Sequence, residues 1–331
     1  MPAHLLARCG QQGWLGLSLP KSVGGQGHDF WSEVVLAEEL AHSRVLGWSL
    51  SLLAHTNMVA PLVATLGTPD QITQIVQPAL RGDHYLALAA TEASSGSDLL
   101  GITTVASPTD GGYRLSGEKL YITNGSLAKF LVVLARTNET PGPWSLSLLV
   151  VAGDRSGVQR ERLATVGLRT SDTAQLKFTD CRLPASARLG RISGGFTALL
   201  QGLQRERLLG AVTANALAGE VLSATVQFLQ QRVRFGEPLM RKQALRHRLA
   251  ALAAKLEASR QFTDNVCSAY AQGLPVDREV LMLKVVSYEL CQEIVNQCVH
   301  WHGAAAFLDD HWLAHVARDC QALSLVAGTS E

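Results

Sequence analysis

Apolar residues recur at helical spacing in two parts of the chain, which are separated by a part with a different pattern. In residues 30–40 apolar side chains recur every three or four positions, with three glutamates largely on the other face. Longer runs of the same kind cover residues 196–232, 242–271, 277–301 and 311–325. This pattern predicts a helical N-terminal domain, residues 1–82, and a C-terminal four-helix bundle of long antiparallel helices, residues 191–331.

The middle of the chain, residues 83–190, contains short runs of β-type residues instead. The runs are residues 84–90, 101–107, 113–116, 130–136, 145–151 and 174–178. Turn sequences such as Asp110-Gly-Gly112 separate them. We therefore expect an all-β middle domain, a barrel or sandwich, between the two helical domains.

Two N-terminal segments carry more specific helix signals. Thr68-Pro-Asp70 combines a capping hydroxyl, a proline for the first turn and an acid near the positive end of the helix dipole. Residues 45–66 are the most apolar stretch, but they include a histidine, an asparagine and a proline. We expect a buried helical segment there rather than a membrane span.

Composition narrows the function classes. The 331 residues are 47% hydrophobic, which predicts a large core in two or three subdomains. The net charge is only +1, so we expect no nucleic-acid or membrane partner. The six cysteines form no CxxC pair and the histidines form no ligand run, so we expect reduced thiols and no metal site. Residues 1–8 lack the apolar core of a signal peptide, which indicates a cytoplasmic protein.

Several longer sequence strings, taken together, are more specific than strand and turn signals alone. The β domain contains Ala90-Thr-Glu-Ala-Ser-Ser-Gly-Ser-Asp98, whose small residues let backbone amides approach a ligand, and Gly117-Glu-Lys-Leu-Tyr-Ile-Thr-Asn-Gly125. The helical part contains Arg232-Val-Arg-Phe-Gly-Glu-Pro-Leu239, followed by Gln243, and the chain ends in Val326-Ala-Gly-Thr-Ser-Glu331. In this order, over nearly the whole chain, the strings resemble the acyl-CoA dehydrogenase family.

The resemblance implies a fold and a reaction. The fold would be helical, β and helical in turn, and the enzyme would use FAD to remove two hydrogens from the α and β carbons of an acyl thioester, giving the enoyl thioester. The resemblance implies cofactor-binding roles for Thr91, Gly96, Ser97, Tyr121, Thr123, Arg232, Phe235, Gln243, His300, Gly303, Ala327, Thr329 and Glu331. It implies substrate-binding roles for Ser97, Gln204, Arg207 and Gly328.

The catalytic base is not where many family members have it. They carry a glutamate immediately before the terminal Gly-Thr pair, where this chain has Ala327. A subset that includes isovaleryl-CoA dehydrogenases places the base in a helical E-R-L segment, which resembles Glu206-Arg207-Leu208 here. We therefore expect Glu206 to take the α-proton while the β-hydride passes to flavin N5, although a solvated helix charge is the simpler reading of a glutamate.

A second departure lies at His300-Trp-His-Gly-Ala-Ala-Ala-Phe307, where the family pattern has more glycines. The added methyl groups of Ala304 and Ala306 are expected to crowd the dinucleotide.

The resemblance leaves the substrate carrier and the electron acceptor open. The thioester would be on CoA or on an acyl-carrier protein, and an electron-transfer flavoprotein or oxygen would take the electrons. A homodimer or homotetramer is expected, because the family uses the arginine, phenylalanine and glutamine of residues 232–243 to contact a neighbour's FAD. The alternatives are an oxidase or flavin monooxygenase relative, and a non-catalytic member that binds an acyl carrier.

Overall fold

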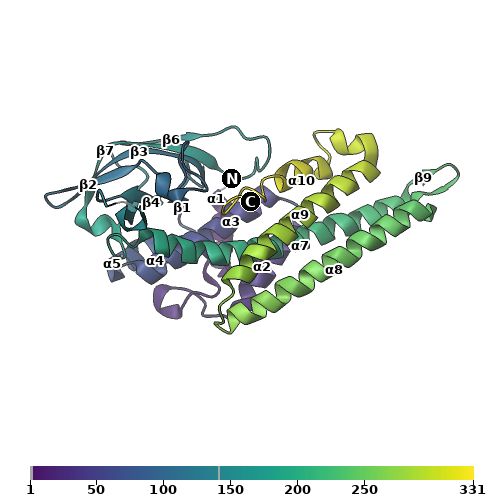
Figure 1. The fold of residues 1–331 in the computed structure, drawn as a ribbon, viewed down its shortest axis with the longest axis horizontal. Coiled ribbons are helices and arrows are strands. Elements are labelled where there is room, and N and C mark those ends of the chain that lie inside the picture. The colour runs from purple at the N-terminus through teal and green to yellow at the C-terminus, as the bar shows by residue number, and fades with distance from the viewer. Residues whose placement is uncertain (1–2, 141) are drawn as a thin grey trace. The chain divides into compact units, whose positions relative to one another are not determined.

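The structure, a computed structural model, describes residues 3–140 and 142–331 (Figure 1). Contacts within the chain group it into two compact units. Unit 1 contains residues 1–29, 50–165 and 169–206, and unit 2 contains residues 30–49, 166–168 and 207–331.

Unit 1 is built around one eight-stranded sheet. Its strands are β1 (Leu86–Ala89), β2 (Val105–Thr109), β3 (Gly112–Thr123), β4 (Phe130–Arg136), β5 (Leu146–Ala152), β6 (Val158–Arg162), β7 (Thr173–Pro184) and β8 (Arg188–Leu189). Their order is β6-β7-β3-β2-β4-β5-β8, and β1 pairs parallel to β4. Strands β4 and β5 are buried along almost their whole length, because both faces of these apolar runs are covered.

Strands β3 and β7 form the long antiparallel pair of the sheet, and they alternate between buried and exposed positions. The register shifts twice, between Leu115 and Gly117 and between Lys119 and Ile122. The second shift places an extra residue in β3 relative to β7, which is a β-bulge.

The N-terminal helices of unit 1 are short. They are α1 (Ala3–Gln11), α4 (Ala60–Leu66), α5 (Pro69–Gln71) and α6 (Gln77–Leu80), with π-helical turns at Ala54–Val59 and Ile72–Val76. Thr68 and Gln71 form a reciprocal capping box at the start of α5, as the sequence predicts. His55 accepts a hydrogen bond from Leu86 N at 3.1 Å, and burial lowers the pKa of His55 to about 4, so this histidine is a neutral core residue.

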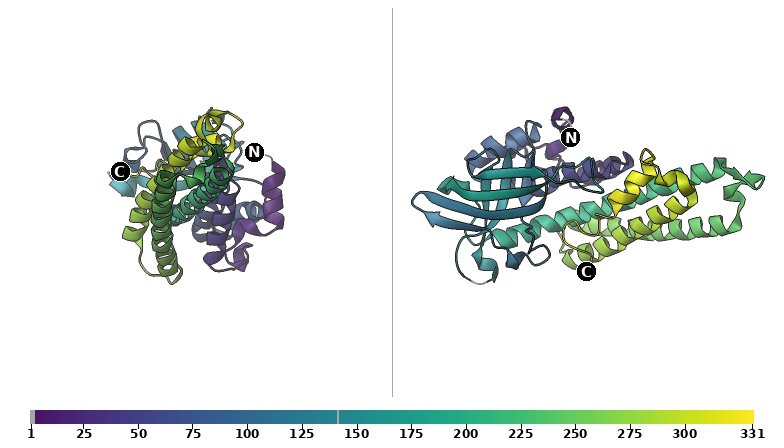
Figure 2. Two further views of the ribbon diagram at one scale, coloured as in Figure 1. Left: turned by 90° about the vertical axis from the view of Figure 1, so that its right-hand side faces the viewer. Right: turned by 90° about the horizontal axis from the view of Figure 1, so that it is seen from above.

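Unit 2 is a helical bundle. Its helices are α2 (Trp31–His42), α8 (Gln243–Ala271), α9 (Asp277–His302) and α10 (Trp312–Cys320), together with the C-terminal part of α7 (Gly195–Gln231). Figures 1 and 2 show α7, α8 and α9 running side by side. A short hairpin, β9 (Val233–Arg234) and β10 (Glu237–Pro238), joins α7 to α8.

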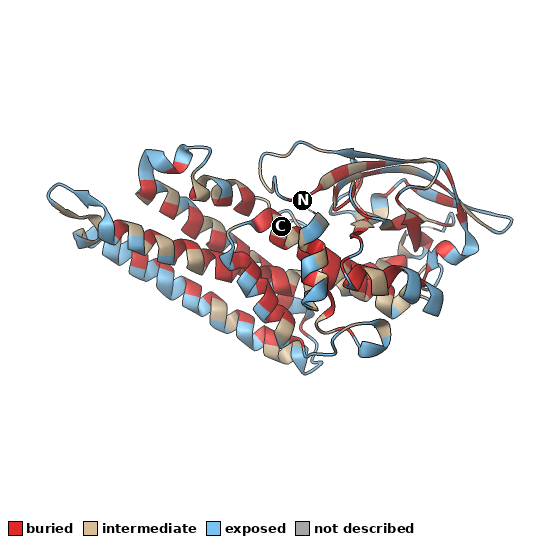
Figure 3. Cartoon of the chain, turned by 180° about the vertical axis from the view of Figure 1, so that it is seen from behind, coloured by how far each residue is buried: buried red, intermediate tan, exposed pale blue. Residues whose placement is uncertain are grey.

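Helix α8 shows why these sequences form a bundle. From Leu249 to Val266 its buried residues are spaced alternately three and four positions apart, so that they make one mostly apolar seam, while its other positions are largely exposed (Figure 3). Asn215 of α7 lies in that seam, where it donates to Thr263 Oγ1 and accepts from Ser259 Oγ, each at 2.8 Å. The buried amide therefore satisfies both of its functional groups on one partner helix.

Some expected boundaries were wrong. The sequence missed β6 and β8 and placed β2 too early. It found the start of β3 to within one residue but ended the run at Ser116, because Gly117, Glu118 and Lys119 interrupt the β-type pattern, whereas the strand continues to Thr123. The run at residues 311–325 is helical only to Cys320. The apolar stretch at residues 45–66 is helical as expected, in α3 (Leu46–Leu53), a π-turn and α4.

Two helical segments, Leu46–Leu66 and Gly195–Gln231, have the length and apolar composition of a membrane span. In each, 72% of the most apolar window is buried inside the protein, as in core helices of globular proteins. All six cysteines are free and buried.

Gly210 of α7 tests the packing of unit 2. A Cβ at this position would overlap the hydroxyl of the buried Tyr288 on α9, so we expect Gly210→Ala to lower the free energy of unfolding by about 1–3 kcal/mol. Gly202→Ala is the matched control on the same helix, because its Cβ would meet nothing within 4 Å, and alanine should add about 0.5–1 kcal/mol there. Chemical denaturation measures both. A stabilised Gly210→Ala variant would contradict the close approach of α7 and α9.

Candidate active site

In unit 1, the loop after β1 carries Thr91, Gly96 and Ser97. Thr91 is half-buried, and its carbonyl accepts a 2.9 Å hydrogen bond from Leu120 N of β3. Gly96 and Ser97 are exposed, and a Cβ on Gly96 would have only the Thr91 methyl at 4.0 Å. The loop therefore presents open backbone beside the end of β3.

The bulge at the end of β3 turns Tyr121 outward. Tyr121 has the left-handed backbone angle φ 59° and is 65% exposed, which is unusual for an aromatic residue in a strand. Two residues later, Thr123 is half-buried. Asn124 then fixes the turn: its Nδ2 donates to Ser51 O at 2.9 Å, and its Oδ1 accepts from Ser51 Oγ.

A buried ion pair that the sequence analysis did not single out links these two segments. Lys119 Nζ lies 2.9 Å from Glu92 Oε1, and both side chains are almost fully buried. Both residues belong to the strings that resemble the family, Glu92 to residues 90–98 and Lys119 to residues 117–125. The sequence does not show, however, that they face each other.

Helix α7 carries the expected base. Glu206 and Gln204 are half-buried, and the Oε2 atom of Glu206 is buried. Arg205, the residue before Glu206, donates to Ser18 Oγ within unit 1. This position is more protected than that of a charge on an exposed helix face.

In unit 2, two cations hold the segment that ends the chain. Arg207 Nε donates to Ala327 O at 2.9 Å, and the buried Lys284 of α9 donates to Gly328 O and, at 3.3 Å, to Ser324 O. Lys284 is a second residue that the sequence analysis missed, because a lysine in an apolar-periodic helix gives no sign of its partner.

The backbone of this terminal segment is strained. Ala327 and Gly328 have φ angles of 57° and 95°, and a side chain at the first of these positions costs about 1–3 kcal/mol. Within the described parts of the chain, the N–H of Ala327 has no hydrogen-bond acceptor. The cations therefore occupy the carbonyls of the segment and leave one amide available to a ligand.

The remaining expected residues of unit 2 lie near the ends of helices, in the β9–β10 hairpin or, for Thr329 and Glu331, at exposed positions of the terminal segment. Arg232 and Gln243 flank the β9–β10 hairpin and are exposed, and Phe235 within it has φ 54° and is 92% exposed. His300 and Gly303, at the end of α9, are exposed as well. Phe235 is therefore not a core phenylalanine, and its role at the cofactor stays a prediction.

Ala304 and Ala306 differ from each other in their surroundings. Ala306 is buried within the protein, whereas Ala304 is exposed. Of the two added methyl groups, the one on Ala304 lies at the surface and the one on Ala306 does not.

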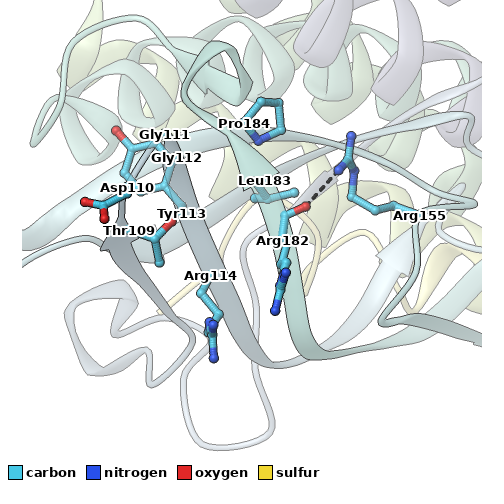
Figure 4. A pocket seen from close by; sticks show the side chains of 10 residues that line it. All are labelled: Thr109, Asp110, Gly111, Gly112, Tyr113, Arg114, Arg155, Arg182, Leu183 and Pro184. Carbon is cyan, nitrogen blue, oxygen red and sulfur yellow. Dashed lines mark hydrogen bonds between the residues drawn. The ribbon is translucent and has the colours of Figure 1, made fainter.

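Unit 1 also has a surface pocket at the end of the sheet opposite to Tyr121. It has a volume of about 520 Å³ at the far end of β3 and β7, and its lining includes Arg114, Arg155 and Arg182 (Figure 4). Arg155 Nη1 donates to Arg182 O at 2.7 Å, so this guanidinium binds a backbone carbonyl of β7. The pocket contains none of the expected site residues.

The fold and these exposed groups define a class of enzyme: a three-domain flavoprotein of the helical–β–helical type. Models of the acyl-CoA dehydrogenase N-terminal, middle and C-terminal domains match residues 1–83, 87–181 and 193–331. The chain belongs to the acyl-CoA dehydrogenase family, whose members are oxidoreductases that act on CH–CH groups and bind FAD.

Individual relatives support this result. The chain is 34% identical to the mitochondrial long-chain specific acyl-CoA dehydrogenase of Rattus norvegicus, over 99% of this chain and 76% of the relative. It is 30% identical to the caffeyl-CoA reductase-Etf complex subunit CarC of Acetobacterium woodii, over 100% of this chain and 87% of that protein. The crystal structure of an acyl-CoA dehydrogenase from Geobacillus kaustophilus matches with a TM-score of 0.95 at 33% identity, covering 100% and 87% of the two chains.

The residues described above fit the family's cofactor. A flavin needs an aromatic surface and hydroxyl or amide groups, and unit 1 presents Tyr121, Thr123 and the open backbone at Gly96. A pyrophosphate needs a cation and close backbone approach, and unit 2 presents Arg232 with Gly236 and Gly303, where an added Cβ would meet nothing within 4 Å.

Lys284→Met tests whether the lysine orders the terminal segment. The variant keeps the length of the side chain but removes the donor to Gly328 O and Ser324 O, so we expect the amides of residues 324–329 to exchange about tenfold faster or more, which is the scale of one charge-assisted hydrogen bond. Hydrogen exchange with mass spectrometry measures this. Lys255→Met, which removes an exposed ion pair with Glu293, should leave the same amides unchanged. Equal exchange in both variants would contradict the role of Lys284.

Proposed function

We propose that the protein dehydrogenates an acyl-CoA thioester between its α and β carbons, with Glu206 as the base that takes the α-proton. The observation that carries this proposal is the arrangement at the Glu206-Arg207 pair. Glu206 has a buried carboxylate oxygen, and the next residue of α7 holds the carbonyl of Ala327. The base is thus directly followed in the chain by the residue that orders the terminal segment.

The chemistry explains why both parts are needed. A thioester α-proton is weakly acidic, so negative charge that develops on the carbonyl oxygen must be stabilised while a base removes the proton. The Ala327 side chain cannot accept a proton, but its N–H is available within the described chain. We assign this N–H to the thioester oxygen, with Gly328 beside it and Arg207 holding the backbone from its carbonyl side.

FAD, when bound, supplies the two-electron acceptor for the β-hydrogen. Its ring is assigned to the exposed edge of unit 1, and the residues for it are Thr91, Gly96, Ser97, Tyr121 and Thr123. Its remaining contacts are assigned to groups on unit 2, in part from a neighbouring subunit of a homodimer or homotetramer. These residues are Arg232, Phe235, Gln243, His300, Gly303, Ala327, Thr329 and Glu331.

The proposed substrate carrier is CoA, because the rat and Acetobacterium relatives are both named for CoA thioesters. Ser97 and Gln204 are assigned to the substrate with Arg207 and Gly328. The proposed electron acceptor is an electron-transfer flavoprotein, in line with the family's partners and the name of the Acetobacterium relative. The cytoplasm is the proposed compartment.

Anaerobic mixing tests the function directly. The holoenzyme is combined with a panel of CoA and carrier-protein thioesters of different chain length, and the visible absorbance of the bound flavin is followed. Bleaching by CoA thioesters supports the proposal. Bleaching by carrier-bound thioesters alone would show that the substrate is carried by a protein and not by CoA. A flavin that no thioester bleaches would show that the dehydrogenase proposal is wrong.

Glu206→Gln tests the base. The amide keeps the shape of the side chain but cannot accept the proton, so flavin reduction by substrate should slow by about 10² or more while FAD binding stays intact. Glu220→Gln is the control, because the same substitution on the same helix removes only a carboxylate that pairs with Arg44. Stopped-flow absorbance measures both rates.

A second variant sharpens this test. In the family the base stands at either of two positions, so Glu206→Gln combined with Ala327→Glu is expected to recover part of the rate. Unchanged reduction in Glu206→Gln would instead make Glu206 a helix charge and require another base.

Phe235→Ala tests the hairpin. Phe235 is almost fully exposed within one chain, so its loss should leave the melting temperature of the apoprotein within about 2 °C but weaken FAD binding at least tenfold, since a ring that stacks on a ligand loses its contact area. Trp144→Ala, at a residue that is 62% exposed on unit 1, is the control for removal of an exposed aromatic side chain. Titration with FAD measures the affinity. Equal affinities in both variants and the parent would remove Phe235 from the site.

A further inference from the structure

The buried pair Glu92–Lys119 connects the two segments of unit 1 that face the proposed flavin site. Glu92 lies one residue after Thr91 in the loop, and Lys119 lies two residues before Tyr121 in β3. Their side chains retain 4% and 0% of their exposure, and their charged atoms are 2.9 Å apart. A charge pair this deep in a β domain requires an explanation, because charged residues are almost never fully buried unless they are paired.

Every described contact of the pair runs to the backbone or side chains of these same segments and their neighbour. Lys119 Nζ also donates to Ala90 O at 2.9 Å, at the start of the loop. Glu92 Oε2 accepts from Thr103 N at 2.7 Å and from Thr103 Oγ1 at 2.8 Å, and Glu92 Oε1 accepts from Thr104 N at 3.0 Å. The carboxylate is thus satisfied from two sides, and the loop is fixed to β3 and to the chain before β2.

The charges of the pair are maintained near neutral pH. Burial alone would raise the pKa of Glu92, but hydrogen bonds from Lys119 and Thr104 outweigh burial and lower this pKa to about 2. Burial lowers the pKa of Lys119 to about 8, against the raising effect of Glu92.

The position of the pair beside the bulge indicates what it does. Leu120, between Lys119 and the strained Tyr121, donates its N–H to Thr91 O at 2.9 Å. The loop, the ion pair and the bulge therefore form one connected element, and Tyr121 has its outward position only while that element stays in register. An apolar pair of similar size would fill the same space without the directional bonds that set this register.

We propose that Glu92 and Lys119 are positioning residues for the flavin: they hold the 91–98 loop and the Tyr121–Thr123 segment in the relative placement in which both face the cofactor. This inference rests on the proposed assignment of Thr91, Tyr121 and Thr123 to FAD. The pair itself does not touch the cofactor and acts through the two segments.

The test removes both charges and keeps one carbonyl oxygen at position 92, which can accept from one of the two amides that bind the carboxylate, Thr103 N or Thr104 N. Glu92→Gln/Lys119→Met is compared with Glu118→Gln/Lys177→Met, which removes an ion pair between β3 and β7 whose side chains are both 53% exposed. FAD affinity per folded apoprotein, the position of the visible flavin absorption bands and the melting temperature of the apoprotein are measured for each. The buried double variant should bind FAD at least tenfold more weakly, with shifted bands, and the control should match the parent.

The outcomes separate this inference from the function on which it rests. A parent protein that binds no FAD overturns both. A parent that binds FAD, together with a folded buried double variant of parental affinity and spectrum, overturns only the positioning role. If the double variant does not fold, the single variant Glu92→Gln is measured instead, because it keeps Lys119 and a side chain of the same size at position 92. Its FAD affinity should fall and its bands should shift, and parental values would overturn the role.

Discussion

Unit 1 depends on one constraint on strand β3: the strand contributes buried side chains to the sheet and also exposes an aromatic residue near its end. Its inward side chains complete the core of the sheet, while its end must present an aromatic ring to solvent. A regular strand alternates its sides with period two, so an extra residue is needed to change that alternation. The bulge before Ile122 supplies this residue, at the cost of a left-handed angle at Tyr121. Hydrogen bonds from neighbouring segments hold the strained conformation.

Buried lysines stabilise irregular backbone in both units. Lys119 donates to the carbonyl of Ala90 in unit 1, and Lys284 donates to that of Gly328 in unit 2. A carbonyl outside regular secondary structure needs a donor once water is excluded, and a charged donor makes a stronger bond than a neutral one. The two loops proposed for the cofactor and the substrate are therefore ordered by lysines from a strand and a helix, in addition to their own backbone hydrogen bonds.

The proposed base shows how one fold accommodates two placements of the same chemistry. A backbone N–H does not depend on the side chain of its residue, so the role proposed for the Ala327 amide does not require a carboxylate at position 327. The carboxylate is free to come from a helix instead, as proposed for Glu206. Arg207 lies next to it in α7 and orders the segment that contains the amide. The requirement is that the base and the amide are both held firmly, and it does not fix which segment supplies the base.

The sequence by itself determined the order of helical and β regions, the capping box at Thr68, the helices of the bundle and the family, because periodicity, caps and motif strings are local properties. It could not give β6 and β8, whose short runs become strands only by pairing with β7 and β5. Only the tertiary structure decided which residues face each other. Lys119 meets Glu92 and Lys284 meets Gly328 because packing brings distant segments together, and no spacing along the chain encodes that meeting.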